Sequence, residues 1–303
     1  MSSVPPFVAV AGVASILVAL ADVFLTLFHP TVTGPIGSAI QRATWRAAHT
    51  LGRGRTAAVA VAAPIGVLLT IATWATLLVF GWAFVYWPHL PDGFHVQEGV
   101  DVGSTFLTAL YTSGVTLSTL GYGEIAPATG WLRLVTPIES LLGFALLTAS
   151  LSWLISIYPA LHRRRQFARR LAAAIANGGD DRLRKLSPSA AAAFLQEAET
   201  GVAAISTDLE QLPVTYYFRE DPAETALPRL LRTLVDVCDM LPETISHEDV
   251  AFRAEMLRRG LDDLADRLRH GFLPDAGRSA VMVLDAYVED HGVTASAAST
   301  SGP

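Results

Sequence analysis

Hydrophobic positions gather in three long runs in the N-terminal half of the chain. The runs are "FVAVAGVASILVALADVFLTLF" (7–28), "AAVAVAAPIGVLLTIATWATLLVFGWAFVYW" (57–87) and "WLRLVTPIESLLGFALLTASLSWLISIYPAL" (131–161). Each is long enough to cross a bilayer as a helix, which takes about 20 apolar residues. The pattern therefore predicts three transmembrane helices. "MSSVPP" carries no basic residue before the first run, so we predict a retained helix within residues 1–30, not a cleaved signal peptide.

Charged positions are concentrated in the other half. Up to residue 160 the chain has five arginines, no lysine and six acidic residues, whereas residues 161–303 carry 17 basic and 22 acidic residues. Long apolar runs followed by a mixed-charge region indicate a membrane-embedded part followed by a water-soluble part.

The arginines also predict the topology. One group lies between the first two runs (Arg42, Arg46, Arg53 and Arg55), and "HRRRQFARR" (162–170) follows the third. Basic loops favour the cytoplasmic side, so both groups are predicted inside, with the N-terminus outside and the C-terminal half cytoplasmic. Residues 88–130 then loop outward, and Tyr86 and Trp131 mark the outer interface. We therefore expect a multi-pass protein of the cell membrane.

Residues 34–51, within a cytoplasmic linker (31–56), have apolar side chains at positions 36, 40, 43, 47 and 51. This roughly helical spacing, with Arg42 and Arg46 on a polar side, predicts an amphipathic helix on the inner leaflet. An ordinary connecting loop is the alternative. Asp22 and His29, near the end of the first run, are expected to extend toward the inner surface. A pairing between them, or with an interfacial arginine, is the alternative.

The outward loop contains a second kind of segment. "VGSTFLTALYTSGVT" (102–116) is apolar and helical in pattern but too short to cross the bilayer, as in a re-entrant helix. "TLSTLGYGE" (116–124) follows directly and is rich in glycine and hydroxyl groups. Irregular backbone at membrane depth is tolerated only where it is buried in protein or lines a water-filled cavity. The segment is therefore predicted to line a pore.

Residues 116–123 match in full the signature Thr-x-x-Thr-x-Gly-Tyr-Gly of potassium channels. Over about residues 57–160 the chain resembles the pore module of tetrameric potassium channels. The resemblance implies an all-α membrane protein with an outer helix (57–87), a pore helix (102–116), a selectivity filter (119–123) and an inner helix (131–160). It also implies that four chains surround one pore and that K⁺ is the permeant ion, with no cofactor.

The resemblance assigns K⁺ binding to the backbone carbonyls of Thr119, Leu120, Gly121 and Tyr122, with the Thr119 hydroxyl as the innermost ring. Gly121 and Gly123 are expected to adopt positive φ, which turns successive carbonyls toward the axis. Tyr122 is expected to point away from the axis and pack against pore helices.

Val115, Thr116 and Glu124 flank the filter as its predicted support. Glu124 replaces the aspartate that is usual in the family, and Val115 stands where some bacterial relatives have a glutamate that pairs with that acid. The carboxyl pair is absent, so the resemblance does not predict how the filter inactivates.

Two inner-helix residues are further candidates. Gly143 lies twenty residues after Gly123, the interval of the hinge glycine in bacterial relatives, so the resemblance predicts a gating hinge; close helix packing is the alternative. Glu139 lies one turn earlier, and an ionisable residue at this depth is expected to be functional. It could face the cavity or, as we favour, bind hydroxyl groups behind the filter such as those of Thr112 or Ser113.

After the third run, a basic cluster is predicted to contact anionic lipid headgroups or to serve only as a topology signal (Arg163, Arg164, Arg165, Arg169 and Arg170). A cytoplasmic helical domain (161–291) follows, with helices predicted from Ser187-Pro188 to about 210 and over 221–241, 246–272 and 277–290. Ala254, Leu257, Leu261, Leu264 and Leu268 form a seam suited to bundle packing. The three aromatic residues of "TYYFRED" (215–221) are expected to pack inside this bundle, with a ligand or partner contact as the alternative. Residues 292–303 are predicted to be a disordered tail.

These features favour a potassium-selective channel, not an enzyme. A poorly selective cation channel and a non-conducting membrane scaffold or sensor remain alternatives. The net charge of −6 gives no support to nucleic-acid binding, and the single cysteine (Cys238) excludes an intrachain disulfide. No glycine fingerprint of a nucleotide-binding domain occurs in the cytoplasmic half.

Overall fold

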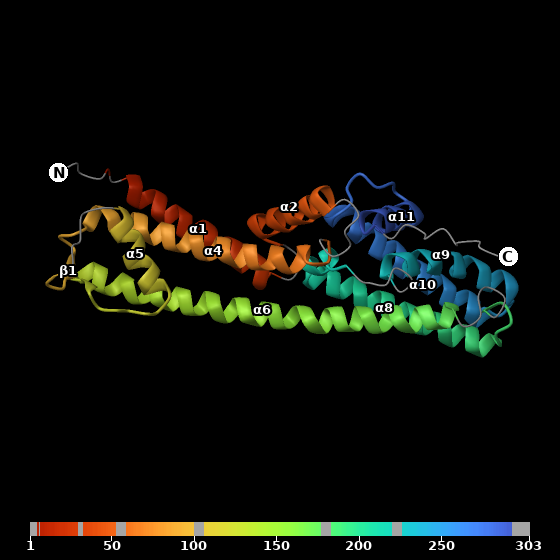
Figure 1. Cartoon of the computed structure of the whole chain (residues 1–303). Coiled ribbons are helices and arrows are strands. Elements are labelled where there is room, and N and C mark those ends of the chain that lie inside the picture. Colours follow the sequence, from red (N-terminus) through yellow and green to blue (C-terminus); the bar gives the residue numbers. More distant parts are fainter. Residues whose placement is uncertain are drawn as a thin grey trace, which may run out of the picture. The chain divides into compact units, whose positions relative to one another are not determined.

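The computed structural model is almost entirely helical, as predicted (Figure 1). The structure describes residues 5, 7–29, 33–52, 59–99, 106–176, 183–219 and 226–292. The chain forms two compact units, one of residues 1–51 and 62–156 and the other of residues 52–61 and 157–303. The first contains the predicted membrane helices and the second the predicted cytoplasmic bundle.

Three helices of the described residues are long and apolar enough to cross a membrane, which confirms the three predicted spans. They are α1 (Phe7–Leu27), α4 (Ala62–Tyr86) and α6 (Gly130–Ala176). α1 and α4 lie side by side (Figure 1). A Cβ atom on Gly12 would lie only 2.4 Å from the carbonyl oxygen of Gly81, and the Ser15 hydroxyl donates to the Leu77 carbonyl oxygen at 2.9 Å. Small residues therefore bring these two backbones together, as is usual for membrane helices.

The linker contains the predicted amphipathic helix, α2 (Pro35–Gly52). Its N-terminus is capped by Asp22 of α1, whose carboxylate accepts hydrogen bonds from the amides of Ile36 (2.8 Å) and Gly37 (3.2 Å). Asp22 is only 1% exposed, so the prediction that it extends to the inner surface was wrong. The physical reason is that the first amides of a helix have no partner within the helix and attract a carboxylate.

The outward loop contains the short 3₁₀ helix η1 (Trp87–His89), the pore-helix candidate α5 (Phe106–Leu117) and two strands. β1 (Phe94–Val96) pairs antiparallel with β2 (Ile125–Pro127), and Phe94 lies opposite Pro127. The sequence pattern did not predict this small sheet, which joins the loop before α5 to the residues after the candidate filter. The expected first residues of the pore helix, 102–105, lie outside the described residues.

The inner helix was predicted to end at residue 160, but α6 continues to Ala176. Residues 161–176 contain neither glycine nor proline and consist mainly of leucine, alanine, arginine and glutamine. These residues favour helix, so the change from apolar to charged composition marks the predicted membrane surface and not the helix end.

The second unit contains α8 (Pro188–Gln211), the 3₁₀ helix η2 (Pro213–Tyr217), α9 (Leu227–Thr244), α10 (Glu248–Gly271) and α11 (Ala280–Asp290). Ser187 caps α8 as predicted, accepting from the Ala190 amide at 3.3 Å. The five seam residues of α10 are all buried. Tyr216 stacks between Phe272 and Tyr287, so the aromatic cluster packs inside the bundle as predicted. The predicted tail lies outside the described residues except for Gly292.

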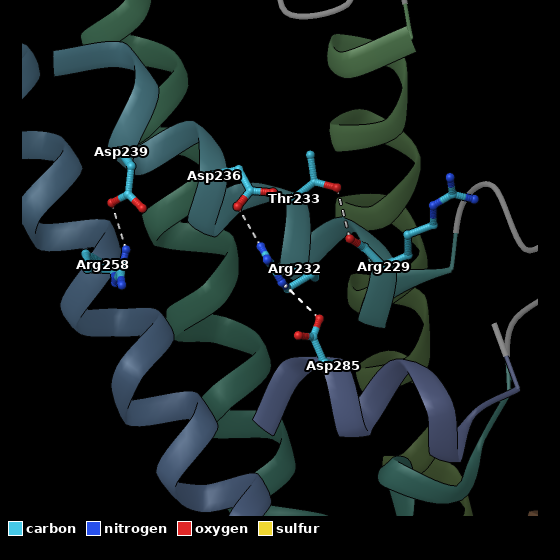
Figure 2. Close-up of polar contacts among 7 residues, drawn as sticks. All are labelled: Arg229, Arg232, Thr233, Asp236, Asp239, Arg258 and Asp285. Atoms are coloured by element: carbon cyan, nitrogen blue, oxygen red, sulfur yellow. Dashed lines mark hydrogen bonds and ion pairs between the residues drawn. The ribbon is translucent and has the colours of Figure 1, made fainter. Parts of the chain in front are cut away.

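Ion pairs connect the outer faces of these helices (Figure 2). Arg232 of α9 contacts Asp236 on its own helix and Asp285 of α11, at 2.6 and 3.0 Å. Arg258 of α10 contacts Asp239 of α9 at 2.8 Å. These groups are partly exposed, so the apolar seam contributes most of the packing energy and the ion pairs only a little.

Candidate functional site

The candidate filter begins where α5 ends. The Thr119 amide donates to the Thr116 carbonyl oxygen at 2.9 Å. The amides of Leu120 and Gly121 both donate to the carbonyl oxygen of Val115, at 3.1 and 3.4 Å. The last turn of the helix therefore holds the inner half of the segment through main-chain hydrogen bonds, which do not depend on the side chain at position 115.

The sign of the backbone angle φ alternates along the segment. Thr119, Gly121 and Gly123 have φ of 62°, 54° and 81°, whereas Leu120 and Tyr122 between them do not have positive φ. The positive φ of both glycines was predicted; that of Thr119 was not. A β-branched residue in this region costs about 1–3 kcal/mol, and such strain is concentrated at functional sites. This alternation suits a row of carbonyl ligands turned toward one axis.

Glu124, at the C-terminal end of the segment, forms hydrogen bonds to two other parts of the structure. The Glu124 carbonyl oxygen accepts from the Gln97 amide at 2.9 Å, which extends the β1–β2 pairing. The Glu124 carboxylate accepts a hydrogen bond from the Tyr111 hydroxyl of α5. The sequence pattern did not predict Tyr111 as the partner of Glu124. The family's known partner for this acid is a glutamate at the position of Val115, which is absent here. A tyrosine on the pore helix, one turn before that position, was the available signal.

Glu139 lies behind the pore helix and is fully buried. Its two carboxylate oxygens accept hydrogen bonds from Tyr86 of α4 at 2.5 Å and from Ser113 of α5 at 2.6 Å. The carboxylate therefore joins three helices at one point. Ser113 is one of the two partners suggested by the sequence, whereas the Thr112 hydroxyl donates to the Thr108 carbonyl oxygen instead. Tyr86 was expected only to mark the outer interface.

Gly143 lies against the end of the pore helix. A Cβ atom at this position would be 1.9 Å from the Leu117 carbonyl oxygen, so no larger residue fits here without a backbone shift. α6 passes through this point without a break. The geometry is that of close helix packing, the alternative considered above, and a hinge at Gly143 stays a prediction.

Three of the five arginines in the basic cluster on α6 contact the helical bundle of the second unit. Arg164 is buried and donates to the Thr215 carbonyl oxygen at 2.9 Å, so its predicted contact with lipid was wrong. Arg163 binds both carboxylate oxygens of Asp208, and Arg170 contacts a carboxylate oxygen of Glu197 at 3.4 Å. The physical reason is that α8 and η2 supply acceptors beside the continued helix. Arg165 and Arg169 are exposed, and their lipid contact stays a prediction.

Comparisons with known proteins identify the class of this region. Residues 67–158 match the model of a family described as ion channel. The match spans most of α4, α5, the candidate filter and the apolar part of α6, and it confirms the resemblance to channels for this part of the chain. With three membrane-crossing helices, the chain is a multi-pass membrane protein.

A curated relative adds a second finding. The chain is 28% identical over 160 residues to "Uncharacterized membrane protein YdjJ" of Bacillus subtilis (strain 168), which covers 52% of this chain and 46% of that protein. The chain thus matches about half the length of this relative. No solved structure matches the chain.

Proposed function

We propose that the protein conducts K⁺ selectively and passively across the membrane through a pore formed by four identical chains. The observation that carries this proposal is the segment 116–123, which has the complete Thr-x-x-Thr-x-Gly-Tyr-Gly pattern and positive φ at alternate positions from Thr119 to Gly123. It lies between a short apolar helix and an inner helix, within a region that matches ion channels.

The proposed mechanism is replacement of the hydration shell of the ion. Carbonyl oxygens of Thr119, Leu120, Gly121 and Tyr122, contributed by four chains, form stacked rings, and the Thr119 hydroxyls form the innermost ring. α5 ends at Leu117, immediately before these rings, so its negative dipole end favours a cation there. One filter strand per chain requires several chains around the axis. Leu120 and Tyr122 are exposed on the single chain, and their side chains are available for contact with neighbouring subunits.

Selectivity for K⁺ over Na⁺ requires that the rings keep their width. Three sets of contacts restrain the segment: the Val115 carbonyl at its inner end, the Tyr111–Glu124 hydrogen bond at its outer end, and the Glu139 cluster behind α5. The proposed gate lies on the inner helices. Because Gly143 contacts Leu117, bending of α6 at this glycine would disturb the end of the pore helix as well.

The test is ion flux into liposomes that contain the purified full chain, under a potassium gradient and then a sodium gradient, with Gly121→Asp as the control variant. We expect potassium flux far above sodium flux in the wild type and none in the variant. Equal fluxes would favour the poorly selective cation channel.

A closed gate also gives no flux, so a second readout is needed that does not depend on opening. Filter ligands stabilise the assembled protein by mass action, so we expect a higher melting temperature of the tetramer in potassium chloride than in sodium chloride. Absence of both the flux and this difference would support the non-conducting scaffold.

A further inference from the structure

α2 has a basic face whose arginines form no ion pair with a carboxylate of the described residues. Arg42 and Arg46 lie four residues apart, so they share one side of the helix, and both are exposed. The helix contains no acidic residue, and no acidic side chain of the described residues forms an ion pair with either arginine. In the second unit, by contrast, Arg163, Arg232 and Arg258 all pair with carboxylates.

The position of α2 is fixed by a membrane helix. The Asp22 carboxylate of α1 holds its first amides, and it also accepts from the Trp74 indole nitrogen of α4 at 2.7 Å. The Gly34 amide donates to the Thr26 hydroxyl at 3.1 Å. A Cβ atom on Gly34 would lie 2.4 Å from the Asp22 carboxylate, so a glycine is required for this approach. α2 therefore starts directly at the end of a bilayer-crossing helix.

The other side of α2 packs against α4. A Cβ atom on Gly66 would meet the side chains of Gln41 and Thr44 at 2.4 and 2.8 Å, so these residues lie on the α4 side. Gln41 is buried, whereas Arg42 and Arg46 lie on the exposed side of the same helix. The exposed residues beside the arginines are alanines (Ala39, Ala43 and Ala47), which allow close approach to an interface.

We propose that the Arg42–Arg46 face of α2 binds the anionic headgroups of membrane lipids. Charge complementarity selects an anion, and the planar guanidinium group matches a phosphate through two parallel hydrogen bonds. The hydrogen bonds from Asp22 to the first amides of α2 keep this face beside a bilayer-crossing helix, where headgroups are concentrated. This position favours a lipid over a soluble anion as the ligand. Three of the five arginines in the α6 cluster are engaged by the bundle, whereas both arginines of α2 are exposed. The proposal does not depend on potassium selectivity.

The experiment measures lipid binding by the full chain in detergent. Phosphatidylglycerol or phosphatidylcholine is titrated, and binding is followed by the number of lipids retained in native mass spectrometry and by the shift in melting temperature. One arginine near an anionic surface contributes about fivefold in affinity, so Arg42→Gln with Arg46→Gln should weaken phosphatidylglycerol binding about 30-fold. The matched control, Arg229→Gln with Arg259→Gln, removes two exposed arginines of α9 and α10 and should change it by no more than about twofold.

Further variants and added salt test whether the loss of binding is due to the loss of charge. Arg42→Lys with Arg46→Lys keeps both charges and should retain most of the binding, and each single glutamine variant should lose about fivefold, which provides a test if the double variant fails to fold. Added salt should weaken the interaction. Three results would overturn the proposal: equal binding of the two lipids, an equal loss in the α9–α10 control, or full competition by millimolar inorganic phosphate, which would indicate a site for a soluble anion.

Discussion

At the scale of single residues, the most informative group is the carboxyl of Glu139. It is buried at the junction of α4, α5 and α6 and satisfies the hydroxyls of Tyr86 and Ser113. A buried polar group that loses its partner costs the free energy of its desolvation, about 1–3 kcal/mol. The position of the pore helix therefore depends on a polar contact and not on apolar packing alone.

Glu139→Val removes the acceptor of two buried hydroxyls, so we expect a loss of about 2–6 kcal/mol in stability, twice the cost of one unsatisfied group. Glu139→Gln keeps an acceptor and should lose less. The measurement is detergent-phase unfolding of the two variants, with Tyr86→Phe completing a double-mutant cycle. An interaction energy near zero in that cycle would mean that the Tyr86–Glu139 contact contributes nothing.

Gly143 leads to a second prediction at this scale. Gly143→Ala places a methyl group on the Leu117 carbonyl, so α6 must move away from α5 at a cost of at least about 1–3 kcal/mol. The control is Gly130→Ala at the start of the same helix, where a Cβ atom meets nothing within 4 Å. If both variants melt at the wild-type temperature, close packing at Gly143 is refuted, and the hinge becomes the better explanation of this glycine.

At the scale of elements, the helical bundle of the second unit depends on the leucine seam of α10 more than on its surface charges. Leu257 is fully buried, whereas Arg232 and its partners are partly exposed. We expect Leu257→Ala to cost about 2–5 kcal/mol and Arg232→Ala less than about 1 kcal/mol. Chemical denaturation followed by circular dichroism distinguishes these values. A larger loss for the arginine variant would show that the pairs in Figure 2 carry the fold.

The thiol of Cys238 in α9 can be used as a chemical probe of folding in the same bundle. Burial raises the pKa of its thiol to about 12 from an ordinary value of 9.0. Because the folded-state pKa is the higher one, the thiol stays protonated up to pH 9, and the reactive thiolate forms only after unfolding. We expect slow maleimide labelling at pH 8–9 in buffer and rapid labelling in denaturant. Rapid labelling of the native protein would contradict the burial of α9.

Helices were predictable where the pattern was long and repeated. The three apolar runs, the Ser187 cap and the α10 seam all follow from local residue order. What could not be predicted depends on contacts between distant residues. Asp22 meets the first amides of α2 and the Trp74 indole, and Arg164 meets the Thr215 carbonyl, 51 positions away. Composition alone assigned both charges to the membrane surface.

At the scale of the whole molecule, the candidate site was predictable as a segment but not as a supported structure. The filter pattern and the positive φ of its glycines follow from residue types. The hydrogen bonds of Tyr111 to Glu124 and of Tyr86 to Glu139 arise only through the fold. A single chain of 32.3 kDa supplies one candidate filter strand, so the proposed pore requires several chains. We expect a native mass of about four chains in mild detergent, as four-fold symmetry of the proposed pore requires.

The central claim is that the carbonyls of residues 119–122 select K⁺. The most direct measurement is the reversal potential of the purified protein in a planar bilayer, with potassium chloride on one side and the same concentration of sodium chloride on the other. A tenfold permeability preference corresponds to about 59 mV for a monovalent ion. Selective conduction of K⁺ predicts a reversal potential displaced from zero by more than this value, in the direction that potassium permeation requires. A conducting pore with a reversal potential near zero would contradict it.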